Sequence, residues 1–201
     1  MPYSDAYKNA INDHGDTIAT HTSIHTDWSA SGANEATGGS PAYARQATAF
    51  DASASGEMAM TGTEVFDLAA DTYHFVGIWS AVTAGTFYGM FPMGGGTANP
   101  PVPFFGRNTG DVIVSDAHGF SDTENVVLFG PNLPTGVTEG TVYFVITASA
   151  NDFQVSLTEG GAAVVITVDG EGIAQRVAPE ILNAQGTLTI NTATLGLNLL
   201  T

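Results

Sequence analysis

Hydrophobic and polar residues alternate along most of this chain, with the period of two that is typical of half-buried β-strands. The alternation is clear in "TIATHTSIHTD" (17–27), "AYARQATAF" (42–50) and "GEMAMTGTEVFDL" (56–68). The intervening "SASGANEATGGS" (29–40) is rich in glycine and small polar residues, and it predicts a loop. The first third of the chain therefore reads as short antiparallel strands joined by loops.

One segment has a different pattern. Residues 4–14, "SDAYKNAINDH", predict a short helix that Ser4 caps at its N-terminus. Ala6, Ala10 and Ile11 are spaced as one helical stripe, which we expect to face the core. The segment is short, so the prediction is a helix of one or two turns.

A hydrophobic hairpin follows in the middle of the chain. "YHFVGIWSA" (73–81), which contains Trp79, is the most hydrophobic segment of the first half, and "VTAG" predicts a turn into "GTFYGMFPM" (85–93). The next stretch, "GGGTANPPVPFFG" (94–106), holds three consecutive glycines and several prolines, so its composition predicts a linker.

The second half has shorter strands and more regular turns. Five strands of a compact antiparallel β unit are predicted, and a final alternating segment, "GTLTINTATLGLNLLT" (186–201), predicts two more. The five are "DVIVSD" (111–116), "NVVLF" (125–129), "TVYFVITA" (141–148), "DFQVSL" (152–157) and "AVVITV" (163–168).

Charge narrows the possible partners. The formal net charge is −16, with 20 acidic residues against Lys8, Arg45, Arg107 and Arg176. Four scattered cations cannot line a groove for phosphates, so we expect no binding to nucleic acid and none to an anionic membrane surface. The chain has no cysteine, which excludes disulfides and thiolate metal sites. It has no basic and apolar leader pattern and no apolar run of about 20 residues, so we expect synthesis in a cytoplasm without a leader.

Residue groups that carry catalytic or metal chemistry are weakly represented. His21 and His25 lie on one face of a predicted strand, about 13 Å apart, which is too far to share a metal ion. His118, in "SDAHGFSD" (115–122), is expected to be a turn histidine that bonds a neighbouring backbone group, and no G-x-S-x-G nucleophile motif occurs. "DGEG" (169–172) offers at most a weak surface site for an ion. We expect no enzymatic activity, no cofactor and no resident metal.

Arg45 is the residue whose position most needs an explanation. In "YAR" the side chains of Tyr43 and Arg45 share one face of a strand, and Glu35 precedes them across the glycine-rich loop. A guanidinium suits one carboxylate together with loop carbonyls. We therefore hypothesise that Arg45 fixes the loop with Glu35 as its partner; the alternative is that Arg45 contacts another subunit.

Four blocks of the sequence resemble, in the same order, a family of small tailed-phage proteins that are labelled tail-fibre-like or minor virion proteins. The blocks are "SDAYKNAINDH", "THTSIHTDWSASGANEATGGSPAYARQATAF", "YHFVGIWSAVTAGTFYGMFPM" and "GTLTINTATLGLNLL". With the residues between the first three blocks included, they span residues 4–93 and 186–200. In that family a short connection joins the third block to the fourth, whereas residues 94–185 lie between them here.

The intervening residues resemble a second phage module, with "AHGF", "LPTGVTEGTVYFV" and "GGAAVVITVDGEG" as the matching motifs. This chain departs from that module at "SDTEN", where "GD" is usual. The resemblance implies an all-β fold: an antiparallel β-sandwich with a short N-terminal helix, formed by residues 1–97 plus 176–201. A second small antiparallel β domain, residues 98–175, is inserted in it. Insertion at a loop tip is physically tolerable, because each doubling of loop length costs only about 0.6 kcal/mol.

The resemblance implies a non-enzymatic structural protein on the exterior of a phage particle. We expect a capsid decoration protein that binds major-capsid subunits; the alternatives are a tail-fibre or minor tail protein that contacts the host, or a carbohydrate-binding module. No heptad run or collagen-like repeat could form a fibre shaft, which favours a compact knob. A homo-oligomer, such as a trimer, is expected. Candidate contact or structural residues are Glu35, Tyr43, Arg45, Trp79, Phe104 and Phe105, with the N-terminal helix as a further contact.

Overall fold

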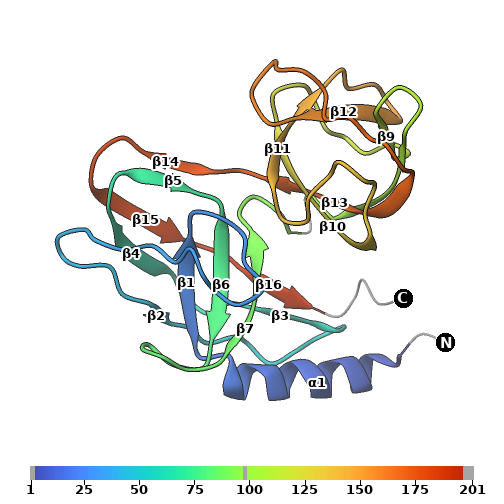
Figure 1. Cartoon of the computed structure of the whole chain (residues 1–201). Helices are drawn as coiled ribbons and strands as arrows, with labels where there is room; N and C mark the ends of the chain where they lie inside the picture. Colours follow the sequence, from blue (N-terminus) through green and yellow to red (C-terminus); the bar gives the residue numbers. More distant parts are fainter. Residues whose placement is uncertain (1–2, 97–98, 197–201) are drawn as a thin grey trace. The chain divides into compact units, whose positions relative to one another are not determined.

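The chain divides into two compact units, one of which is inserted in the sequence of the other. The computed structural model (Figure 1) describes residues 3–96 and 99–196. Unit 1 is formed by Met1–Thr26, Ala30–Met90 and Glu180–Thr201, and unit 2 by Asp27–Ser29 and Phe91–Pro179. The sequence placed the boundaries after residues 97 and 175, so unit 2 extends a few residues beyond the expected insert at each end.

Unit 1 begins with the helix α1, Asp5–Ile18. Ser4 is the N-cap, and its side chain accepts a hydrogen bond from the backbone N–H of Tyr7. The helix is longer than the predicted one or two turns. The predicted core-facing stripe is wrong: Ile11 is exposed, and the buried residues of α1 are Lys8 and Asn12.

A four-stranded antiparallel sheet forms the first layer of unit 1. The strand order is β2-β1-β6-β7, so the hydrophobic segment β6 is an inner strand between β1 and β7. All five residues of β6 are buried, as expected for a strand covered on both faces. The bounds are β1 His21–His25, β2 Gln46–Ala47, β6 Phe75–Trp79 and β7 Phe87–Pro92.

The end of the chain forms the second layer together with an early segment. The last three strands run antiparallel to β5, β4 and β3 in turn, which gives a long interrupted two-stranded ribbon, coloured red and teal in Figure 1. Both ends of the sequence therefore belong to unit 1. The pairs are β14 (Glu180–Leu182) with β5 (Asp71–Tyr73), β15 (Gly186–Ile190) with β4 (Glu64–Leu68), and β16 (Thr194–Gly196) with β3 (Glu57–Ala59).

Side chains connect the sheet to the ribbon. The hydroxyl of Thr22 on β1 donates to the carboxylate of Glu64 on β4. The ring of Tyr43 stacks on Phe66 of β4, with 6.3 Å between centroids, while its hydroxyl bonds to β1. Phe66 and Ile24 are fully buried. The two layers thus face each other across an apolar interior, as in a β-sandwich.

Unit 2 is a closed antiparallel barrel of six strands with the order β10-β11-β12-β9-β8-β13. Its interior is an apolar cluster that includes Ile113, Leu128 and Phe153, each fully buried. Closure pairs every strand on both sides, which removes exposed sheet edges. The bounds are β8 Val102–Arg107, β9 Val112–Val114, β10 Asn125–Asn132, β11 Val142–Ile146, β12 Asp152–Ser156 and β13 Gly170–Val177.

Two strands of the barrel differ from the sequence prediction. The predicted linker contains β8, where Pro103 pairs with Ile173 but lies before the ladder with β9 begins, so its missing N–H costs little. The predicted strand 163–168 forms only an isolated bridge, Thr135–Val168. The Asp111 carboxylate accepts the N–H of Ile166 instead. The next strand along the chain, β13, pairs with β10 and β8 and closes the barrel.

The fold class predicted from the sequence is confirmed: the described chain is all-β, with antiparallel sheets and one short N-terminal helix. Among residues 3–96 and 99–196, no helix has the length and hydrophobicity that crossing a membrane requires.

Candidate functional site

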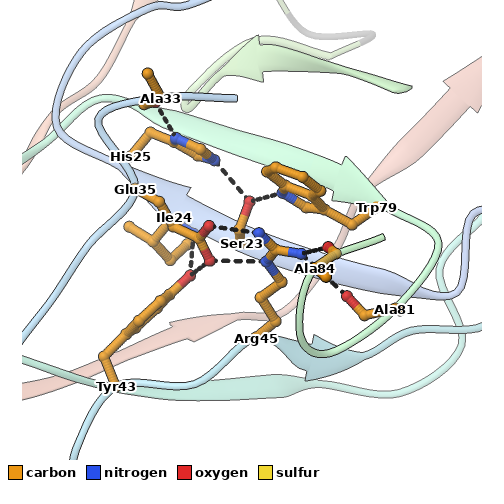
Figure 2. Close-up of polar contacts among 10 residues, drawn as sticks. All are labelled: Ser23, Ile24, His25, Ala33, Glu35, Tyr43, Arg45, Trp79, Ala81 and Ala84. Carbon is orange, nitrogen blue, oxygen red and sulfur yellow. Dashed lines mark hydrogen bonds and ion pairs between the residues drawn. The ribbon is translucent and has the colours of Figure 1, made fainter. Parts of the chain in front are cut away.

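The residues predicted around Arg45 lie together in unit 1 and form a buried polar network (Figure 2). Arg45 directly precedes β2, and its guanidinium binds the Glu35 carboxylate through two parallel hydrogen bonds. Nε donates to Oε1 over 2.8 Å, and Nη2 donates to Oε2 over 2.7 Å. The Arg45 side chain is 9% exposed and that of Glu35 21%. Arg45 thus forms the ion pair that the sequence predicts, in the bidentate geometry that arginine favours.

Arg45 also fixes the turn between β6 and β7. Nη1 donates to the carbonyl oxygens of Ala81 and Ala84, over 3.1 and 2.7 Å. The guanidinium carbon lies 3.4 Å from the centroid of a Trp79 ring, a close cation–π contact. One cation therefore joins the glycine-rich loop, the hairpin turn and an inner strand of the sheet.

Tyr43 links this ion pair to the centre of the sheet. Its hydroxyl donates to Glu35 Oε1 over 3.0 Å and accepts the backbone N–H of Ile24, also over 3.0 Å. Burial, followed by the nearby Glu35 carboxylate, raises the pKa of Tyr43 far above its usual value, although the bond from Ile24 acts the other way. The tyrosine therefore remains neutral and acts as a hydrogen-bonding bridge.

A second group, which the sequence analysis missed, lies beside Trp79. Its indole N–H donates to Ser23 Oγ over 2.8 Å, and Ser23 Oγ lies 2.6 Å from Nε2 of His25. His25 Nδ1 is 2.9 Å from the carbonyl of Ala33, which can only accept. The proton of the neutral ring must therefore be on Nδ1, and Ser23 donates to Nε2. Alternation did signal that Ser23 and His25 share a face, but not that both are buried.

Burial has a direct electrostatic effect on His25. Desolvation lowers the pKa of His25 below its usual value, assisted by the Arg45 charge and opposed by the Ala33 carbonyl and the Glu35 carboxylate. A protonated ring would also place a donor at Nε2 that competes with the Ser23 hydroxyl proton. The hydrogen bonds of the network therefore require the neutral form of His25.

Two glycines make room for these side chains. Gly77 on β6 lies opposite Ser23 on β1, and a Cβ at that position would collide with Ser23 Oγ and His25 Nε2. Gly32 has φ of +78°, and a Cβ there would lie 2.5 Å from the Trp79 ring and 2.8 Å from Phe87. Both positions therefore require glycine, for space at Gly77 and for space and backbone conformation at Gly32.

The network acts as a clamp, by which we mean that it holds the 29–40 loop and the hairpin turn in place. Ser23 and His25 form a nucleophile-and-base pair in outline, but both are fully buried and the third partner is a backbone carbonyl. A substrate would not reach Ser23 in this conformation. The charged groups are mutually neutralised, since Arg45 and Glu35 satisfy one another. The arrangement rigidifies the 29–40 loop and the hairpin turn.

The two phenylalanines predicted as contact residues lie elsewhere, in unit 2, and differ from each other. Phe104 is 5% exposed and belongs to the barrel core, so of the two roles considered for it, structural or contact, its position fits the structural one; alternation along β8 turns it inward. Phe105 is 42% exposed on the outer surface. Ile173 on the neighbouring β13 is also exposed, and the register places it diagonally from Phe105.

Other candidate groups occupy structural positions. His118 accepts the backbone N–H of Phe120 at Nδ1 over 3.0 Å, which is the turn role expected for it. His21 bonds to its neighbour Thr20. Within the described ranges, no three His, Asp or Glu side chains are grouped so as to hold a metal ion.

The chain matches no protein-family model, no curated protein and no solved structure.

Proposed function

We propose that the chain is a structural protein on the exterior of a tailed-bacteriophage particle. As a homo-oligomer, it decorates the capsid by binding major-capsid subunits through unit 1 and displays the barrel of unit 2. It acts without catalysis and without a cofactor. The alternative is a tail protein, which shares the resemblance to virion proteins.

One observation carries this proposal. The sequence blocks that resemble the phage family are dispersed over nearly the whole chain, yet the strands and helix they contribute fall mainly in unit 1. Arg45 contacts both Glu35, from the same second block, and Trp79, from the third block, within unit 1. The residues of the second resemblance lie in the barrel, unit 2. Each resemblance thus coincides with a physical unit.

The rigidity that the clamp gives to unit 1 supports a role in strengthening a capsid shell. A decoration protein strengthens a shell by burying surface across neighbouring subunits, so that internal pressure must break extra contacts. Such a protein gains from a rigid body, because little conformational entropy is then lost on binding. The strong acidic charge, −16, keeps particles that display many copies soluble and mutually repelling.

Quantitative mass spectrometry of purified particles from the encoding phage tests the proposal. A copy number comparable with that of the major capsid protein, and labelling over the head in electron micrographs, is the expected result. A few copies located at the tail would favour the tail-protein alternative. Absence of the protein from washed particles would contradict both.

A further inference from the structure

The helix α1 is oriented opposite to an ordinary amphipathic helix. Such a helix turns its apolar face to the core and its polar face to water. In unit 1, α1 is instead held against residues 50–57 by polar side chains. Asn12 Nδ2 donates to the carbonyl of Gly56 over 2.8 Å, and Asn9 Oδ1 accepts the N–H of Gly56 over 2.8 Å.

Two carboxylates complete this polar attachment. Asp13 Oδ1 accepts the N–H of Ser53 over 2.8 Å, and Asp16 Oδ1 accepts the N–H of Phe50 over 3.0 Å. Lys8 on the same side is buried, with Asp5 4.0 Å away as its ion-pair partner. The charged and amide groups of the helix are thus largely committed to unit 1.

The opposite side of α1 is apolar and exposed. At about 100° per residue, the helical side chains of this face fall within an arc of about 60° that includes Tyr7, and the three carboxylates of the helix lie about 120° or more from Tyr7. The rings of Tyr3 and Tyr7 are in contact, with centroids 4.9 Å apart. This outward face consists of Tyr3 (56% exposed), Tyr7 (51%), Ile11 (42%), Ile18 (38%) and the exposed His14.

We propose that the outward face of α1 binds the same face of a second copy of this chain. Tyr7, Ile11, His14 and Ile18 are spaced by four, three and four residues, which is the spacing along which helices associate side by side. The flanking positions on one side of this face are Ala10 and Thr17, which are small and allow close approach. On the other side Lys8 is buried, and a Cβ at Gly15 would lie 3.8 Å from Met58, so both positions are turned toward their own unit.

The charge pattern of the outward face favours a second copy of the chain over a basic partner as the occupant. Two molecules with a net charge of −16 repel each other wherever their carboxylates meet. The outward face carries no carboxylate, so two copies can meet there without bringing acids together. A basic partner would gain nothing at this face, because it offers no negative group for a lysine or arginine to pair with.

The helix is also prepared for association. A free peptide with two heptads would have to form its helix on binding, which is costly. Here the Ser4 cap and the polar attachment to unit 1 fix the helix in advance. Little conformational entropy is therefore lost on association, although the short face predicts a reversible complex. The inference does not depend on a location in a phage particle.

Sedimentation velocity and light scattering on the purified full chain, from micromolar to millimolar concentration, provide the first test. We expect a concentration-dependent oligomer for the wild type and a monomer for Tyr7→Glu/Ile11→Lys, which conserves the net charge. The control Val82→Glu/Val65→Lys changes two other exposed hydrophobic residues of unit 1 and should still associate. Melting curves verify that both variants are folded, which is expected because the altered side chains are on the surface.

Cross-linking provides a second readout. Because the chain has no cysteine, Ile11→Cys introduces a single thiol, which should oxidise rapidly to a covalent dimer. Val65→Cys should dimerise much more slowly. A wild type that stays monomeric, a Tyr7→Glu/Ile11→Lys variant that still associates, or equal cross-linking at positions 11 and 65 would overturn the proposal. None of these results would affect the particle location tested above.

Discussion

Unit 2 and unit 1 are stabilised in different ways. The barrel of unit 2 closes on itself, pairs each strand on both sides and fills its interior with apolar side chains. Unit 1 has an open four-stranded sheet and a two-stranded ribbon, and neither β14, β15 nor β16 contains a fully buried residue. Its two layers also enclose apolar side chains, but they are joined by a largely buried ion pair, Arg45–Glu35, and by a helix attached through amides and carboxylates. The ion pair of unit 2, Arg176–Glu124, is more exposed.

The difference indicates where each unit is vulnerable. An apolar core loses stability gradually as methylene groups are removed, in proportion to the cavity created. A buried ion pair is more sensitive, because removal of one partner leaves the other charged and unpaired in a poorly solvated site. Single substitutions in the Arg45–Glu35 network should therefore disrupt unit 1 and leave unit 2 unaffected.

The largest effect is expected from Arg45→Met. It leaves the Glu35 carboxylate without its bidentate partner and frees two loop carbonyls, so unit 1 should lose about 4 kcal/mol of unfolding free energy. Urea unfolding followed by hydrogen exchange in peptides from each unit measures this loss. Arg107→Met, at an exposed position in unit 2, is the control and should change little. An unchanged unit 1 would eliminate the clamp.

A comparable but somewhat smaller effect is expected in the barrel from Leu128→Ala. Leu128 is fully buried, and the truncation should cost about 3 kcal/mol in unit 2 only. Leu157→Ala, at a residue that is 65% exposed in the same unit, is the matched control. If Leu128→Ala destabilised both units equally, the two would not be independent, and the comparison would fail.

A moderate effect is expected from Asn12→Ala in α1. The substitution removes the donor to the buried carbonyl of Gly56 and to Ser53, which should cost about 2 kcal/mol in unit 1. The neighbouring Ile11→Ala, on the outward face, should change the stability of the monomer by less than about 0.5 kcal/mol. Equal costs at the two positions, measured at low protein concentration, would contradict the polar attachment.

The smallest expected effect is a dependence of the unfolding free energy of unit 1 on pH. Because burial lowers the pKa of His25 in the folded state, the unfolded chain binds a proton more readily. The contribution of His25 is complete above its unfolded value of about 6.5, and it is lost as the pH falls below that value toward the folded pKa. Urea titrations of unit 1 between neutral and mildly acidic pH measure the loss.

The variant His25→Asn should reduce this dependence, since its amide still donates toward Ala33 but does not titrate. His21→Asn, at a neighbouring half-buried histidine, should retain it. A wild type whose stability does not change across this range would show that His25 does not sense pH.

Much of this organisation was predictable because strand alternation and turn composition are local signals. The Arg45–Glu35 pair was also predictable, since the spacing in "YAR" and the glycine-rich loop leave few partners for a rare cation. The barrel strand β8 was not, because prolines and glycines disfavour a strand locally. It forms because neighbouring strands satisfy its remaining backbone groups and Phe104 fills the core.

Two further features depend on tertiary contacts that the sequence pattern does not encode. The buried face of α1 is polar because residues 50–57 present free backbone groups to it, so hydrophobic periodicity selected the wrong side. The Ser23–His25–Trp79 group depends on the absence of a side chain at Gly77, on another strand. Such contacts cannot be seen from either strand alone.

The central claim is that both ends of the chain fold as one unit, independently of the segment between them. Native-state hydrogen exchange of the intact wild-type chain in increasing urea tests it most directly. We predict that amides of β15 and β4 exchange with the same unfolding free energy and urea dependence, distinct from those of β8 and β13. Exchange of β15 together with the barrel strands, and separately from β4, would contradict the account.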